Sequence, residues 1–121
     1  MSEPISFDLH LPAPPPPGGN RQTQGRLRRT WKGQCDMHTL AQLCGAPRVD
    51  GAFSLAITLR QNNNGAVLTT YVNDLIGYLR DRELIHSAGP GHLRKLVLAW
   101  GSADEAPDGV RLELRELGTA A

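Results

Sequence analysis

Residues 51–79 read GAFSLAITLR-QNNNG-AVLTTYVNDLIGYL and decide the fold. In the first part, apolar residues stand at every second position, which predicts a half-buried strand over Gly51–Arg60. From about Ala66 the apolar residues recur every three or four positions, which predicts an amphipathic helix. The inner stripe of this helix comprises Val67, Tyr71, Val72, Leu75, Ile76, Tyr78 and Leu79. The stretch is therefore a strand–hinge–helix unit.

The hinge of this unit carries three neutral amides in a row, Asn62, Asn63 and Asn64. An asparagine oxygen accepts a hydrogen bond from the free N–H groups at a helix start, so Asn63 or Asn64 is suited to cap the helix. We find no acidic residue between Gly51 and Asn73. The hinge is therefore polar but carries no negative charge.

Three further strands are predicted on either side of the unit. Ile5–Leu11 alternates apolar and polar residues until Pro12 closes it, and Pro14–Pro17 then favours polyproline II. Leu93–Trp100 and Val110–Leu117 alternate likewise, and an acidic turn lies between them.

A first helix is expected to run from Trp31 to Leu43, with Thr30 as its cap. Its expected inner face comprises Met37, Leu40, Ala41 and Cys44. The preceding segment 12–30 is expected to be a proline-rich and basic loop. The alternative is that its basic part, from Arg21 onward, is an early start of the same helix.

The order β-α-β-α-β-β indicates an α/β (α+β) fold, with a mixed sheet of about four strands and two helices on one face. At 121 residues, with 40% hydrophobic and 21% charged residues, the chain is expected to be one domain over 1–121. Its two cysteines are too few for a disulfide framework, which favours a cytoplasmic protein. We expect no secretory signal and no membrane-spanning segment.

In order and length these elements resemble the RusA family of Holliday-junction resolvases, and the resemblance covers nearly the whole chain. It is carried by Leu11-Pro12-Ala13-Pro14-Pro15 with Asn20-Arg21, by the unit from Gly51 to Leu79, and by Gly109-Val110-Arg111-Leu112-Glu113-Leu114. The resemblance implies a small homodimer that binds branched DNA. It also implies hydrolysis that depends on Mg²⁺.

The catalytic positions that the resemblance implies carry no carboxylate here. The family's first aspartate pair, at the start of the long helix, falls among Asn62, Asn63, Asn64 and Gly65, and its lysine falls near Thr69. A later aspartate pair falls in Ser87-Ala88-Gly89. Magnesium-dependent hydrolysis usually needs two or more carboxylates, because anionic oxygens offset the cost of dehydrating the ion. We therefore expect no metal site and no cofactor, with Mg²⁺ required only if the nuclease is active.

The strongest nucleic-acid signal is a run of basic residues without an acidic one: Arg21, Arg26, Arg28, Arg29 and Lys32. Such a run neutralises phosphates and gives affinity for DNA that depends on salt but not on sequence. The alternative is a solvated loop, since the net charge of +1 gives no signal by itself. Arg94 and Lys95 either extend the same surface or face water.

Two alternatives stay open at this point. The chain can be an active nuclease whose acids come from elsewhere, such as Asp81, Glu83 or a partner subunit. It can be a regulator that binds a protein partner and no DNA. Cys35 with His38 and Cys44 superficially suggests zinc, but further ligands at usable spacing are missing. Trp31 and Trp100 are expected in the core or at a dimer interface.

Overall fold

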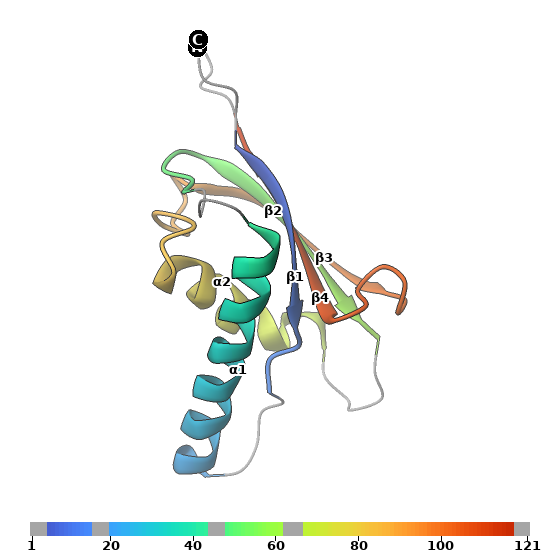
Figure 1. The fold of residues 1–121 in the computed structure, drawn as a ribbon. Coiled ribbons are helices and arrows are strands. Elements are labelled where there is room, and N and C mark those ends of the chain that lie inside the picture. Colours follow the sequence, from blue (N-terminus) through green and yellow to red (C-terminus); the bar gives the residue numbers. More distant parts are fainter. Residues whose placement is uncertain (1–4, 16–19, 44–47, 62–66, 118–121) are drawn as a thin grey trace.

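The structure, a computed structural model, describes residues 5–15, 20–43, 48–61 and 67–117 (Figure 1). Its elements follow the predicted order. They are β1 (Ser6–Pro12), α1 (Arg21–Gln42), β2 (Phe53–Arg60), the 3₁₀-helix η1 (Leu68–Tyr71), α2 (Val72–Asp81), β3 (Leu93–Gly101) and β4 (Gly109–Glu116).

The four strands form one mixed sheet in the order β1-β4-β2-β3. β4 runs antiparallel to both β1 and β2, whereas β2 and β3 run parallel. A parallel pair needs a crossover connection, and α2 supplies it. Figure 1 shows α1 and α2 on the same side of the sheet. The predicted fold, a mixed four-stranded sheet with two helices, is confirmed.

The core lies between one face of the sheet and the two helices. In β2 the burial alternates strictly from Phe53 to Leu59, because successive side chains of a strand point to opposite faces. The helices contribute Trp31 and Cys35 from α1 and an apolar stripe from α2. The buried stripe of α2 comprises Leu75, Tyr78 and Leu79. The strand–hinge–helix unit thus supplies much of the core, as its sequence pattern predicted.

The first helix is longer than the main prediction, and the segment 12–30 is not one continuous loop. α1 begins at Arg21, and Asn20 caps it by accepting a hydrogen bond from the Thr23 N–H at 2.8 Å. Thr30, the predicted cap, lies inside the helix. The residues after Asn20 are mainly good helix formers without proline, so a cap at this position suffices to start the helix. The alternative that the basic segment from Arg21 onward is an early start of the first helix is therefore correct.

The predicted inner face of α1 is wrong for Met37, Leu40 and Ala41, which are all exposed. Met37 and Leu40 are 72% and 80% exposed, whereas Trp31 and Cys35 are buried. The indole Nε1 of Trp31 donates to the Pro12 carbonyl at 2.8 Å, which fixes the rotation of the helix against β1. The side of α1 that faces the core is therefore set by Trp31. Cys44 lies outside the described residues.

The second helical segment begins with η1 at Leu68, and Val67 before it is 62% exposed. Val67 therefore does not belong to the inner stripe. Ala66 and the hinge amides lie outside the described residues, so the predicted cap by Asn63 or Asn64 stays a prediction. At the far edge of the sheet, Leu96, Val97 and Trp100 of β3 are 38%, 45% and 37% exposed, so Trp100 is not a core residue.

Candidate nucleic-acid interface

The first half of α1 is a basic surface. Between Arg21 and Cys35 the helix carries no acidic residue, and Figure 1 shows its first turns extending past the end of the sheet. The N-terminus of a helix also carries a partial positive charge, because its first N–H groups have no partner within the helix. The charge of the arginines and the helix dipole therefore act in the same direction.

Three of the five predicted DNA-binding residues lie around one shallow hollow. Arg21, Arg26 and Arg29 line it together with Gln22 and Gly25, and its volume is about 390 Å³. All three arginines are exposed, and none of them forms an ion pair with any other part of the chain that the structure describes. Gly25 adds no side chain to the hollow, and no side chain or other element lies within 4 Å of the position that its Cβ would take. The hollow therefore presents three free guanidinium groups.

The other two predicted residues face α2 instead. Arg28 lies 3.6 Å from the Asp74 carboxylate, and the Nζ of Lys32 donates to Asp81 at 2.9 Å. Both pairs are partly exposed, so each adds little to stability. The structure therefore divides the basic run into two groups. Arg21, Arg26 and Arg29 are free, whereas Arg28 and Lys32 have acidic neighbours.

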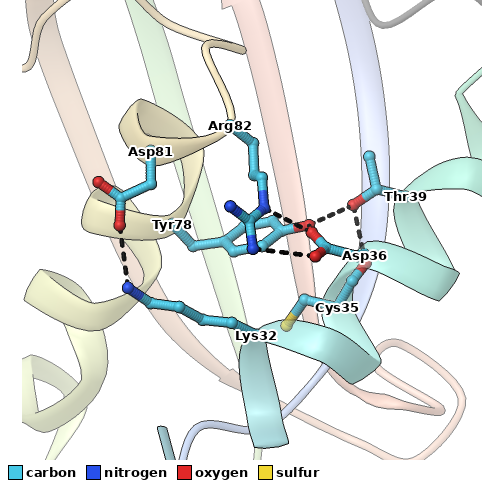
Figure 2. A network of polar contacts seen from close by, with 7 residues as sticks. All are labelled: Lys32, Cys35, Asp36, Thr39, Tyr78, Asp81 and Arg82. Atoms are coloured by element: carbon cyan, nitrogen blue, oxygen red, sulfur yellow. Dashed lines mark hydrogen bonds and ion pairs between the residues drawn. The ribbon is translucent and has the colours of Figure 1, made fainter. Parts of the chain in front are cut away.

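A polar network connects the two helices next to this surface (Figure 2). Arg82 donates two hydrogen bonds to the Asp36 carboxylate, at 2.6 Å and 2.9 Å, and the Tyr78 hydroxyl donates a third at 2.9 Å. Thr39 shares a further hydrogen bond with Tyr78. The network holds α1 against α2 and so fixes the direction in which the basic half of α1 extends.

The ionisation of this network follows from its contacts. Burial alone would raise the pKa of Asp36, but the hydrogen bonds from Arg82 and Tyr78 outweigh it and hold the pKa below its usual value. Burial and the neighbouring Asp36 carboxylate together raise the pKa of the Tyr78 hydroxyl to about 12, against a lowering by the hydrogen bond with Thr39. Asp36 is therefore charged and Tyr78 neutral at pH 7. No local sequence pattern indicates the Asp36–Arg82 pair, because 46 positions separate its members.

The cysteine that suggested zinc is part of the packing between the helices. Cys35 is fully buried, and burial raises the pKa of its thiol to about 12. His38 turns elsewhere, with its Nδ1 3.8 Å from the Asp108 carboxylate. Among the described residues no group of three or more His, Cys, Asp or Glu side chains is arranged to hold a metal ion.

The predicted catalytic positions are described only in part. Asn62, Asn63 and Asn64 lie outside the described residues. Thr69 is exposed within η1, at the start of the helical segment, and no acidic residue lies in that turn. Ser87-Ala88-Gly89 forms part of the connection from α2 to β3, where the Ser87 hydroxyl accepts a hydrogen bond from the Gly89 N–H.

The acids proposed as replacements are engaged with basic residues. Asp81 pairs with Lys32, and the Glu83 carboxylate lies 4.0 Å from Arg48. Glu83 has a positive φ of 58°, at the end of α2.

Arg94 and Lys95 do not extend the basic surface of α1. They lie at the start of β3. β1 and β2 both run antiparallel to β4, and β3 runs parallel to β2, so β3 runs in the same direction as β1. The first half of α1 lies near the end of β1, where Trp31 contacts Pro12. The two basic groups are therefore at opposite ends of the sheet.

We compared the chain with known proteins. No protein-family model matches it, and no curated protein sequence matches it. In the part of the chain that the structure describes, no helix is both long and apolar enough to span a membrane.

Proposed function

We propose that this protein binds branched DNA through the first half of α1 and does not cut it by a metal-dependent reaction. It would be a RusA-like homologue that works as a homodimer in the cytoplasm, since a two-fold symmetric junction suits a symmetric pair of subunits. The observation that carries the proposal is the hollow with the three free guanidinium groups of Arg21, Arg26 and Arg29.

Phosphate is the ligand that this surface suits best. A guanidinium group presents a planar fork of N–H donors that matches two phosphate oxygens. Each phosphate that is neutralised releases counterions, so the affinity falls steeply with salt. The surface offers no pattern for reading bases, which agrees with recognition of DNA shape and charge.

The proposed lack of cleavage is supported by the chemistry of the acidic residues. The hinge and Thr69 are neutral, and an amide oxygen provides no charge to balance a magnesium ion. Asp74 and Asp81 face Arg28 and Lys32, so to bind a metal they would have to give up these partners. The alternative of an active nuclease requires Asp81 or Glu83 to leave its basic neighbour.

A second candidate function is recognition of a protein partner without DNA. It is favoured by the exposure of Met37 and Leu40 on the second half of α1, since large apolar side chains at such positions are often found in interfaces. In this case the arginines would be dispensable. The two candidates are separated by the salt dependence of DNA binding.

The test compares two double variants of α1 on a labelled four-way junction over a range of salt concentrations. We expect Arg26→Ala/Arg29→Ala to reduce the slope of log K against log salt by about 2, because two free phosphate contacts are removed. We expect the matched control Arg28→Ala/Lys32→Ala to reduce the slope by less, because these cations already have acidic neighbours.

Equal effects of the two variants would contradict the assignment of the hollow as the phosphate site. Absence of binding by the unmodified protein would reject DNA as the ligand and favour the protein partner. Circular dichroism of each variant checks that α1 remains folded.

A further inference from the structure

β3 is an open edge of the sheet. It is last in the strand order and pairs only with β2 among the described strands. The Gly101 carbonyl accepts a hydrogen bond from the Gln61 N–H at 3.0 Å, so the backbone of Gly101 faces β2. Because the N–H and C=O groups of successive residues alternate in direction along a strand, those of Leu96, Leu98 and Trp100 point away from β2, toward the open edge.

The side chains of this edge are mainly apolar. Leu96, Leu98 and Trp100 pair in register with buried residues of β2 and lie on the same face of the sheet as the helices. Nevertheless Leu96 and Trp100 are more than a third exposed, and so is Val97 on the other face. A long apolar edge strand of this kind is normally covered or paired in a native protein.

At the opposite edge of the sheet, α1 covers the last part of β1. The Gln42 side chain accepts from the His10 N–H and donates to the His10 carbonyl, both at 2.7 Å. The Trp31 indole binds the Pro12 carbonyl next to it. Among the described residues α1 therefore occupies the outward backbone groups of β1 at His10 and Pro12, which favours β3 over β1 for an association through sheet edges. An association that uses β3 alone stops at two copies.

We propose that β3 pairs antiparallel with β3 of a second copy, about a two-fold axis at Val97. The two four-stranded sheets then join into one. In this register Leu96 of each copy lies opposite Leu98 of the other, and Arg94 lies opposite Trp100. The outward backbone groups of Leu96 and Leu98 then bond each other across the axis.

The charges at the ends of β3 favour a second copy over any other occupant. Arg94 and Lys95 are at the start of the strand, and Asp104 and Glu105 are in the turn after its end. An antiparallel pair brings the basic start of each copy beside the acidic turn of the other, so opposite charges meet at both ends. This self-complementarity is the property that a symmetric interface requires.

This interface deepens the homodimer of the proposed function and rests on that part of it, but it uses none of the arginines of α1. Its test is therefore made without DNA, by sedimentation velocity over a range of protein concentrations. We expect the unmodified protein to form dimers and Arg26→Ala/Arg29→Ala to remain dimeric. We expect Leu96→Pro to be monomeric, because proline removes an outward N–H and leaves the bonds to β2 in place.

A charge exchange provides a second test that does not depend on how well the proline variant folds. We expect Arg94→Glu/Lys95→Glu to raise the dissociation constant of the dimer about tenfold or more at low salt, because like charges then meet. Addition of Asp104→Lys/Glu105→Lys in the same chain should restore the dimer.

Four results would overturn the interface: a monomeric unmodified protein, a folded Leu96→Pro variant that still dimerises, open polymers, or charge reversal without effect. Junction binding is then measured on the same variants. Salt-dependent binding by a monomeric unmodified protein would reject the interface and keep the DNA proposal. A dimeric protein that binds no DNA would keep the interface and reject the DNA proposal.

Discussion

Asp36 connects the two helices through charged hydrogen bonds from Arg82 and through the Tyr78 hydroxyl. Replacement by asparagine keeps the size of the side chain and removes its charge. Because both charged side chains are about two-fifths exposed, we expect Asp36→Asn to lower the free energy of unfolding by about 1 kcal/mol at pH 7. Urea denaturation measures this free energy. Glu83→Gln is the control, because Glu83 lies 4.0 Å from its basic neighbour Arg48 and pairs with it only weakly.

The pH dependence of this variant follows from the lowered pKa of Asp36. A pKa lower in the folded than in the unfolded state stabilises the fold above the unfolded value of about 4, and this stability is lost as the pH falls through the folded value. We therefore expect the difference between the unmodified protein and Asp36→Asn to be constant above about pH 5 and to shrink below about pH 4. A difference that grows on acidification would contradict the ion pair.

Cys35 gives a second prediction at the scale of one residue. With burial raising its pKa to about 12, only about one thiol in ten thousand is ionised at pH 8. We expect iodoacetamide to leave Cys35 unmodified in the folded protein and to modify it in urea, as measured by peptide mapping. Equally fast labelling in both conditions would show that Cys35 is not in the core.

Most single residues of the core could be predicted from the sequence, whereas their polar partners could not. The alternation in β2 and the stripe of α2 identify buried positions because a strand and a helix have fixed periods. The pairs of Asp36 with Arg82 and of Lys32 with Asp81 depend on how two distant helices pack, and no local pattern encodes this.

At the scale of the elements, the start of α1 was the main uncertainty. A basic run is compatible with a loop and with a helix. Here the cap at Asn20 and the contact of Trp31 with Pro12 stabilise the helix. These contacts also explain why Met37 and Leu40 face solvent. Periodicity alone could not determine the rotation of this helix, because its apolar residues do not lie on a single face.

Two glycines test the elements directly. Gly109 starts β4 with a φ of +125°, and a Cβ there would lie 2.7 Å from the Ala13 nitrogen. We expect Gly109→Ala to lower the free energy of unfolding by about 2 kcal/mol or more, through strain and this close approach. The matched control is Gly33→Ala within α1, where nothing lies within 4 Å of the new Cβ.

Gly33→Ala should raise the free energy of unfolding by about 0.5–1 kcal/mol, because alanine has the higher helix propensity. Both variants are measured by urea denaturation. Destabilisation by Gly33→Ala would indicate that this part of α1 is not a helix, and a neutral Gly109→Ala would contradict the turn before β4.

At the scale of the whole molecule, the sequence predicted the order of the elements and the mixed sheet, both of which are confirmed. The order of the elements could be predicted because each element is identified from the pattern of its own residues. The handedness of a parallel crossover then restricts the topology. The exposure of the β3 edge was not predicted, because Leu93–Trp100 has the pattern of a core strand and only the strand order shows that it is at the edge.

The basic half of α1 and the neutral hinge together define the central claim, which is binding of branched DNA without metal-dependent cleavage. The most direct measurement incubates freshly purified protein with a labelled four-way junction, with and without Mg²⁺ or Mn²⁺, and resolves it on native and denaturing gels. We predict a retarded band that weakens as salt is raised, and no shortened strands with either metal. Shortened strands that require the metal, or no retarded band at low salt, would contradict this claim.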